Sequence, residues 1–415
     1  MAAAVKIDIT GYAPSRNSWH AWNDGPVCAR HWKPKAPGEC LSPQQLPKTF
    51  THMPTLFDPI ALGALNASNR AFMAPLTRAR ATRDHVPTPI MADHYAQRAT
   101  AGLIIGEATG ISRQAVGWPY APGLWSSEQV KGWMPVTQAV HDKGGLIFAQ
   151  LWHMGRMAHS AVTGRQPVSA SATAMPGDAH TYEGKKPFEI ARPLAIEEIP
   201  SLISDYVSAA SNAMAAGFDG VQIHAANGQL LDQFLRDGTN ARTDEYGGSI
   251  DNRVRLLGRV TQAVADEVGA DRTAVRLSPN GESYGVDDSN PASLFTAAAE
   301  MLNAIGIAFL ELREPGPDGT FGATDVPRLS PQIRRHFKGA LVLNSDYDVE
   351  RAKADLDSGL ADAISFGRPF LANPDLVWRL RHDAPLNKDD MATYYSQGAE
   401  GYTDYETLTG SKALA

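Results

Sequence analysis

From Met53 onward the chain alternates short apolar runs with stretches of helical periodicity. The apolar runs lie at residues 71–76, 103–106, 146–151, 220–223, 273–277, 307–312, 340–344 and 362–366. Continuous apolar runs of this length are typical of parallel strands that are buried on both faces. The clearest helical patterns between them cover residues 200–217, 254–268 and 292–303. Strands that alternate with helices in this number predict an α/β fold, a (β/α)8 TIM barrel.

The gap between the third and fourth predicted strands is the longest in the chain. Residues 152–219 contain many glycines and prolines before their helix begins. A connection that follows a barrel strand leaves from the carboxyl face of the barrel, so a long one lies over that face. We therefore expect a long capping excursion after strand three.

The first 52 residues differ in character from the rest. They hold both cysteines, Cys28 and Cys40, and show no clear period. Cys28 and Cys40 with His20 and His31 form no standard zinc spacing. The main body has no cysteine and therefore no disulfide, cysteine-bound metal or thiol nucleophile. We predict an irregular extension over residues 1–52 and one barrel over residues 53–415.

Composition narrows the class of protein. The chain has 415 residues, a formal net charge of −7 and 20% charged residues. No Lys/Arg-rich block is present, which argues against nucleic acid or an anionic membrane as partner. No apolar stretch approaches the ~18 residues of a membrane helix. We expect a soluble, cytoplasmic protein that is a monomer or a homodimer.

The fourth predicted strand ends in two polar residues, His224 and Asn227, followed by Gly228. Barrel enzymes keep their chemistry at the carboxyl ends of the strands. A neutral imidazole and a carboxamide each supply an N–H donor, so the two side chains suit one electronegative atom. The alternative is a buried core histidine beside a turn asparagine.

Other strand ends also carry polar residues that would face the same cavity. These are Thr77 after strand one, Gln150, Trp152 and His153 at strand three, and Arg276 at strand five. Ser345, Asp346, Gly367 and Arg368 follow strands seven and eight, where barrels often bind phosphate. Asp346 would repel a phosphate unless only its backbone N–H is offered. A surface turn with an exposed arginine is the alternative there.

The sequence lacks the residues that two reaction classes need. No lysine lies between Lys186 and Lys338, so a Schiff-base enzyme built on strands four to eight has no nucleophile. A metallohydrolase needs several converging ligands. Only Glu107, His153 and His224 are placed for that role, and we expect no metal.

The body resembles the old yellow enzyme family of FMN-dependent ene-reductases, and is most similar to its 2-enoate or N-ethylmaleimide reductase-type members. The resemblance runs from about Met53 to Tyr405. It rests on motifs at residues 73–78, 95–98, 150–156, 223–228, 244–248 and 365–368. Several independent motifs in one order make the match specific.

The resemblance implies a noncovalent FMN on top of the barrel. Thr77 would contact the flavin O4, Gln150 the pyrimidine edge, and Arg276 the N1 and O2 side where negative charge gathers on reduction. The phosphate would lie on Arg368 and the backbone of Ser345, Asp346 and Gly367. An aspartate at position 346 belongs to the pattern of this subgroup. The remaining implied cofactor contacts are Pro75, Leu76, Ala108 and His224.

The same resemblance implies the reaction. His224 and Asn227 would bind the carbonyl or nitro oxygen of an activated alkene such as an enone, a maleimide or a nitroalkene. NADH or NADPH would reduce the flavin first and leave, which gives ping-pong kinetics. The implied substrate pocket has the aromatic lining Trp118, Trp152, Phe321, Tyr394 and Tyr395, residues that barrel-mouth packing explains nearly as well.

The sequence departs from the family at Gln229, where a tyrosine commonly delivers a proton to the α-carbon. A carboxamide is not a useful acid near neutral pH, and losing a general acid costs about 10²-fold or more. We hypothesise that water, ordered by Gln229 or Tyr395, supplies the proton. Alternatively, position 229 only lines the pocket.

Two other functions remain open at this point. A flavin-free barrel lyase or hydrolase would be colourless when purified. A flavin-binding sensor would hold a flavin that nicotinamides do not bleach. Gln229 is the one residue that favours this alternative.

Overall fold

The computed structural model of the chain describes residues 53–408. The predicted extension over residues 1–52 lies outside the described residues, and so do Cys28 and Cys40. The division at residue 53 therefore stays a prediction. Within the described part, no helix has the length and hydropathy needed to cross a membrane.

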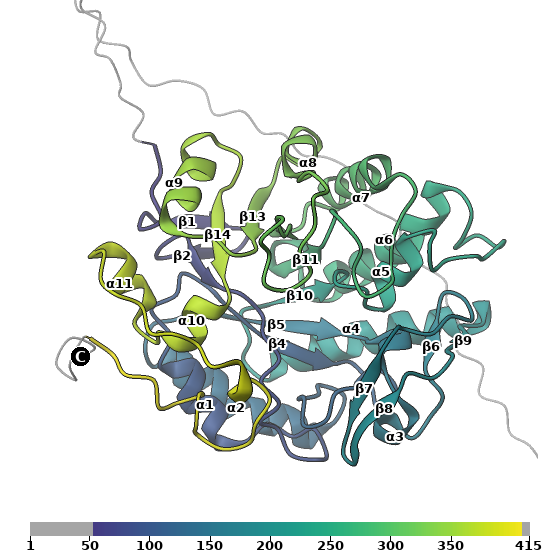
Figure 1. Ribbon diagram of the computed structural model, residues 1–415, viewed down its shortest axis with the longest axis horizontal. Coiled ribbons are helices and arrows are strands. Elements are labelled where there is room, and N and C mark those ends of the chain that lie inside the picture. Colours follow the sequence, from purple (N-terminus) through teal and green to yellow (C-terminus); the bar gives the residue numbers. More distant parts are fainter. Residues whose placement is uncertain (1–52, 409–415) are drawn as a thin grey trace, which may run out of the picture. The chain divides into compact units, whose positions relative to one another are not determined.

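A closed parallel barrel forms the centre of the described part of the chain and confirms the predicted fold (Figure 1). Its eight strands, in chain order, are β3 (Ala71–Met73), β4 (Ile104–Gly110), β5 (Ile147–Trp152), β10 (Gly220–His224), β11 (Thr273–Leu277), β12 (Phe309–Arg313), β13 (Ala340–Asn344) and β14 (Ala363–Phe366). Each matches one predicted run. The first strand is shorter than its run, because Pro75 has no N–H to donate to a neighbouring strand.

Helices lie outside the strands (Figure 1). Those that follow successive barrel strands are α1 (Pro89–Ala96), α2 (Ser127–His141), α4 (Ile199–Ala215), α6 (Ile250–Val268), α7 (Pro291–Ile305), α8 (Ser330–His336), α9 (Val349–Asp357), α10 (Arg368–Ala372) and α11 (Leu376–Arg381). Two shorter helices, α3 (Ser160–Thr163) and α5 (Leu230–Leu235), lie within connections. The hairpin β1 (Ile60–Leu62) and β2 (Leu65–Ala67) precedes the barrel.

The barrel interior is layered. Alternate residues of a strand point to the same face, so each strand places every second side chain inside. The lower layer is apolar: the ring of Phe309 lies against those of Phe72 and Phe148, and Leu62 of the preceding hairpin packs in the same cluster. The layer two residues further along the strands is polar: Gln150, Gln222, Arg276, Glu311, Asn344 and Ser365. The floor of the cavity is therefore lined by hydrogen-bonding side chains, and the layer beneath that floor is apolar.

The long excursion after the third barrel strand reaches the mouth of the barrel, as predicted. It contains α3, the short strands β6 (Val168–Ser169) and β9 (Arg192–Pro193), and the hairpin of β7 (Asp178–Thr181) and β8 (Gly184–Pro187). His180 of this hairpin lies with its ring centroid 4.5 Å from that of Trp118 and 6.3 Å from that of Tyr395. The excursion thus contacts two of the predicted cavity residues.

Buried arginines fasten the segment that follows the last helix. Arg78 donates to the carbonyl of Gly401 at 2.7 Å, and Arg80 donates to the carbonyl of Thr393 at 3.0 Å. The two arginine side chains are 1% and 2% exposed. Because backbone carbonyls of the segment are their main partners, these contacts depend little on the side chains of the segment. They hold residues 393–401 against the loop that carries Thr77.

Candidate functional site

A cavity of about 380 Å³ opens at the carboxyl ends of the strands. Its size lies within the usual range of roughly 300–1,000 Å³ for small-molecule sites. Of the residues predicted to face it, His153 does not line the cavity. All the others do: Pro75, Leu76, Thr77, Ala108, Trp118, Gln150, Trp152, His224, Asn227, Gln229, Arg276, Phe321, Ser345, Asp346, Gly367, Arg368, Tyr394 and Tyr395. The structure therefore brings together residues that lie more than 300 positions apart in the chain.

The partners of His224 fix its protonation. Its Nδ1 lies 3.4 Å from the backbone N–H of Ala226, which can only donate, so Nδ1 accepts and the ring proton sits on Nε2. Burial, followed by the positive charges of Arg276 and Arg313, holds the pKa of His224 well below its usual value. The ring is therefore neutral near pH 7 and offers one N–H donor.

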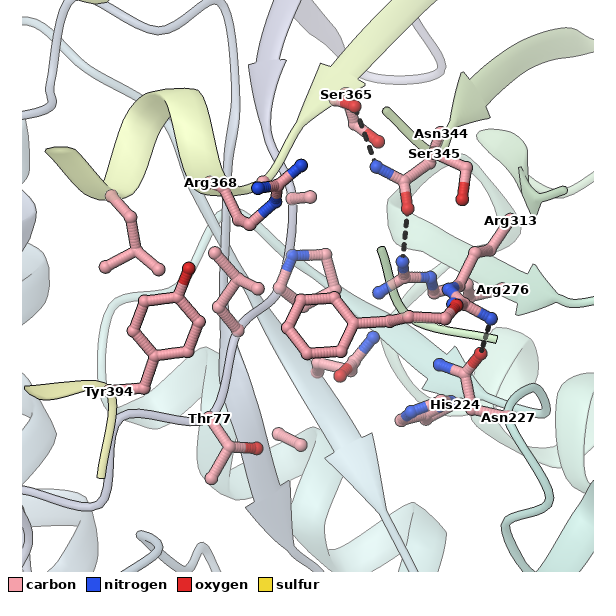
Figure 2. Close-up of a pocket in the computed structure, with 18 of the residues that line it drawn as sticks. Thr77, His224, Asn227, Arg276, Arg313, Asn344, Ser345, Ser365, Arg368 and Tyr394 are labelled. Carbon is pink, nitrogen blue, oxygen red and sulfur yellow. Dashed lines mark hydrogen bonds between the residues drawn. The ribbon is translucent and has the colours of Figure 1, made fainter. Parts of the chain in front are cut away.

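Asn227 lies beside His224 in the turn after β10 (Figure 2). Its φ of 57° is left-handed, a conformation that asparagine tolerates better than most residues. Its backbone N–H donates to Ser278 Oγ at 2.7 Å, and its side-chain Oδ1 accepts from Arg313 at 3.2 Å. With Oδ1 occupied, the remaining side-chain group is the Nδ2 donor.

Gln229 is the residue that precedes α5, and it is buried. Its Oε1 accepts from the indole N–H of Trp152 at 2.8 Å. An indole has no acceptor, so this bond fixes the orientation of the amide and leaves Nε2 as the free group of Gln229. The side chain therefore has only N–H donors to spare.

A relay of hydrogen bonds in the polar layer fixes the direction of Gln150. Glu311 accepts from Gln222 Nε2 at 2.7 Å and from Ser365 Oγ at 2.5 Å. Gln222 Oε1 in turn accepts from Gln150 Nε2 at 2.7 Å. Because an ionised carboxylate can only accept, each amide in the relay turns its NH2 toward Glu311. Gln150 is left with an oxygen acceptor to offer to a ligand.

Arg276 is the cation of the cavity floor. It lies on β11 between His224 and Glu311, with which it is in register on the two neighbouring strands. Its Nη2 donates to Asn344 Oδ1 at 2.6 Å (Figure 2). Its Nε lies 3.6 Å from the Glu311 carboxylate. Burial lowers the pKa of Arg276 while the charge of Glu311 raises it, and the net shift is downward. The guanidinium nevertheless remains a fixed positive charge near pH 7.

The loops after β13 and β14 form the other end of the cavity. Ser345 and Asp346 have positive φ values of 118° and 46°. Such conformations cost about 1–3 kcal/mol each and are typical of functional loops. Arg368 donates to Asp346 Oδ1 at 2.8 Å. The acidic side chain that would have repelled a phosphate is thus paired with an arginine that can share its charge.

Aromatic side chains surround the mouth. The rings of Trp118 and Tyr395 have centroids 4.7 Å apart, and those of Tyr394 and Tyr395 are 6.4 Å apart. Tyr395 is 45% exposed and Phe321 is 37% exposed. These two rings lie between the cavity and solvent, so they can exclude water when a ligand is bound.

The metal hypothesis loses two of its three candidate ligands. Glu107 is fully engaged away from the cavity, where it accepts from the backbone N–H groups of Arg78 and Ala79. Burial lowers the pKa of His153 to about 3, and its Nδ1 accepts from the N–H of Gly155. Of the three, the cavity is lined by His224 alone.

Known proteins match the chain over most of its length. The sequence pattern of the NADH:flavin oxidoreductase / NADH oxidase family covers residues 55–387. The chain belongs to this family. The structure of an old yellow enzyme homologue from Zymomonas mobilis is 63% identical with a TM-score of 0.85. The match covers 86% of this chain and 100% of the homologue. Morphinone reductase in complex with tetrahydroNAD is 45% identical with a TM-score of 0.81, over 86% and 98% of the two chains. 12-Oxophytodienoate reductase 2 of Arabidopsis thaliana is 41% identical over 358 residues, 85% of this chain and 96% of its own.

Membership confirms the resemblance to the old yellow enzyme family that the motifs indicated. It also confirms the expected class, an oxidoreductase that uses FMN and a nicotinamide. The structure offers groups that fit such a cofactor. Within residues 53–408, the Thr77 hydroxyl and the buried Nε of Arg276 have no hydrogen-bond partner. A Cβ on Gly367 would meet only Leu76, at 3.7 Å, so the backbone there is open to a ligand.

Sequence reasoning missed several residues of this flavoprotein's cavity. They are Ala74, Arg78, Met154, Met157, Tyr284, Arg313, Asn344, Tyr347, Asp348, Ser365, Phe366, Pro369 and Leu371. A signal existed for Arg313, because Glu311 and Arg313 place charges at alternate positions at the end of an otherwise apolar strand. Asn344 was noted as the end of its strand without being assigned a role.

Proposed function

We propose that this family member reduces carbon–carbon double bonds activated by a carbonyl, imide or nitro group, with NADH or NADPH as the source of electrons. The observation that carries the proposal is the donor pair of His224 and Asn227. Both N–H groups are fixed by partners of unambiguous polarity, and both belong to the cavity that contains Arg276. Two similar proteins, 12-oxophytodienoate reductase 2 and morphinone reductase, are named as reductases, which supports a substrate of this class.

The residues of the cavity floor would hold FMN. Gln150 would accept a hydrogen bond from the N–H of its pyrimidine edge, while Thr77 would donate from its hydroxyl. Arg276 would lie near the side where negative charge gathers, and Arg368 near the phosphate. Bound FMN supplies hydride chemistry that links the nicotinamide to the alkene. The remaining proposed contacts are Pro75, Leu76, Ala108, Ser345, Asp346 and Gly367.

His224 and Asn227 would bind the oxygen of the activating group. Negative charge grows on this oxygen as the β-carbon accepts a hydride, so two fixed donors stabilise the transition state more than the ground state. A neutral His224 suits the role because its Nε2–H donates a hydrogen bond without giving up its proton. The nicotinamide and the alkene would occupy the same aromatic-lined cavity in turn, which gives ping-pong kinetics.

Anaerobic reduction tests the proposal. Purified protein should be yellow, and NADH or NADPH should bleach the flavin absorbance. Adding an enone, a maleimide or a nitroalkene should then restore it. His224→Ala and Asn227→Ala should each slow reoxidation by about 10²-fold, the usual cost of removing one oxyanion donor. Flavin that nicotinamides reduce but that no activated alkene reoxidises would contradict the proposed substrate class.

Gln229 defines the proton step. Its free Nε2 donors would bind a water through the water oxygen, which leaves the water hydrogens free to reach the α-carbon. Water is a weaker acid than a positioned side chain. We therefore expect substrates with stabilised anions, such as nitroalkenes, to depend less on this step than simple enones.

Gln229→Tyr tests this account, with Gln229→Phe as the matched control without a hydroxyl. Turnover of 2-cyclohexenone relative to a nitroalkene should rise by about 10-fold or more in the tyrosine variant and not in the phenylalanine variant. Equal ratios in the two variants would show that position 229 only lines the cavity.

Cytoplasmic location and a monomeric or dimeric state stay predictions.

A further inference from the structure

Arg313 is a charged side chain with an uncommon set of partners. It ends β12, lines the cavity, and donates from Nη1 to Asn227 Oδ1 and from Nη2 to the carbonyl oxygen of Phe321. Both recipients belong to the proposed substrate site. Among residues 53–408, no carboxylate forms an ion pair with it.

The bond to Asn227 decides what the amide offers to a ligand. An isolated carboxamide can turn either its oxygen or its NH2 toward a cavity, and the two orientations differ little in shape. A guanidinium can only donate, so the atom that faces Arg313 must be the oxygen. The NH2 group then lies on the other branch of the amide, beside His224 (Figure 2).

Arg313 also contributes charge. Burial, and then the neighbouring Arg276, lower its pKa to about 10, so it remains protonated near pH 7. A partly buried cation with no ion-pair partner among residues 53–408 favours negative charge on a nearby ligand. The donor bond to Phe321 further ties the loop that carries this mouth residue to the same guanidinium.

We propose that Arg313 is a positioning residue: it fixes Asn227 with its N–H toward the ligand oxygen and biases the site toward ligands whose oxygen carries negative charge. The proposal rests on the proposed function for the identity of the site. It deepens that function because the same charge grows on the substrate oxygen during reduction. Arg313 acts through Asn227 and does not itself need to touch the substrate.

Ligand binding to the FMN-loaded protein separates the two effects. The probes are benzaldehyde and benzoate, planar aromatic ligands of which benzoate has one more oxygen and a negative charge, and the readout is the dissociation constant from the change in flavin absorbance. Arg313→Met should weaken benzaldehyde by about 10-fold, through loss of one oriented hydrogen bond. It should weaken benzoate by about 10-fold more, through loss of the charge.

Two further variants test polarity. Arg313→Lys keeps a donor and the charge, so both ligands should bind within about 3-fold of wild type. Arg313→Glu presents only acceptors, which turns the NH2 of Asn227 toward position 313 and its oxygen toward the ligand. Both probes should then bind at least about 100-fold more weakly. Arg255→Met is the control, because it removes an exposed arginine of α6 that contacts Glu245 and Asn252.

The outcomes are decisive in either direction. Equal affinities in wild type and Arg313→Met, or a Glu variant no worse than the Met variant, would overturn the proposal. If Arg313→Met does not fold, Arg313→Lys against Arg313→Gln makes the same comparison of charge at similar side-chain length. If the Arg313 variants shift both dissociation constants as expected but the wild-type protein reduces no alkene, the proposed function is refuted and this inference stands.

Discussion

Breaking the buried pair of Arg276 and Glu311 should destabilise the protein severely. The two side chains are 6% and 0% exposed, and the shortest distance between their charged groups is 3.6 Å. Glu311 also accepts from Gln222 and Ser365, so its removal leaves two donors and a cation without their acceptor.

The magnitude follows from distance and burial. At an effective dielectric constant of about 20, two charges 3.6 Å apart attract by about 4–5 kcal/mol. Desolvation offsets most of this gain in the intact protein. Removing one partner keeps the desolvation cost of the other, so Glu311→Met should lower the free energy of unfolding by about 3–5 kcal/mol. Arg276→Met should then cost at least about 2 kcal/mol less in the Glu311→Met background than in wild type.

Urea unfolding of the FMN-free protein, followed by tryptophan fluorescence, measures the four proteins of this cycle. Asp357→Ala is the control, because it breaks the exposed pair with Lys353 and should cost less than about 1 kcal/mol. Additive effects of Arg276→Met and Glu311→Met, within about 0.5 kcal/mol, would refute the view that the two charges stabilise each other.

Three further predictions concern protonation, the cofactor and the carboxyl-terminal segment. Burial lowers the pKa of His153 to about 3, so below about pH 6.5 the unfolded chain takes up the histidine proton while the folded chain does not. Wild type should therefore lose unfolding free energy between pH 7.5 and 5, and His153→Gln should lose about 2 kcal/mol less in urea titrations. Parallel pH profiles of the two proteins would contradict this. Gly367→Ala should fold with unchanged stability, since the new methyl meets only Leu76 at 3.7 Å, yet bind FMN about 10-fold more weakly by fluorescence titration; unchanged affinity would remove Gly367 from the cofactor site. Gly401→Ala should lower the melting temperature, because φ is +60° and the new Cβ would lie 1.9 Å from Thr393 Oγ1, whereas Gly398→Ala has φ of +84° but meets nothing within 4 Å and should cost only its backbone strain; equal losses would show that the contact is unimportant.

The barrel and the composition of its cavity were predictable because each depends on local chemistry. Most barrel strands are apolar runs with a polar residue at or just after the carboxyl end, and parallel strands bring those ends to one face. His224 and Asn227 therefore needed no knowledge of their partners to be placed together. Thr77 and Arg276 were placed in the same way, by their position at a strand end.

The orientation of the amides could not be predicted, because it is set across strands. Gln150 offers an oxygen only because Glu311, far along the chain, accepts through Gln222. Arg313 was missed for the same reason, since its role depends on Asn227 at the end of a different strand. A single sequence shows which groups converge but not which atom of each group faces the ligand.

The arginine fastening of residues 393–401 bears on how the molecule is made. A ribosome releases the chain from its amino end, so Arg78, Arg80 and all eight barrel strands emerge before Tyr394 and Tyr395 do. A nascent chain can therefore close its barrel while one flank of the cavity is still open to water. That flank closes only after residues 393–401 have been synthesised and their backbone carbonyls bind the guanidinium groups of Arg78 and Arg80.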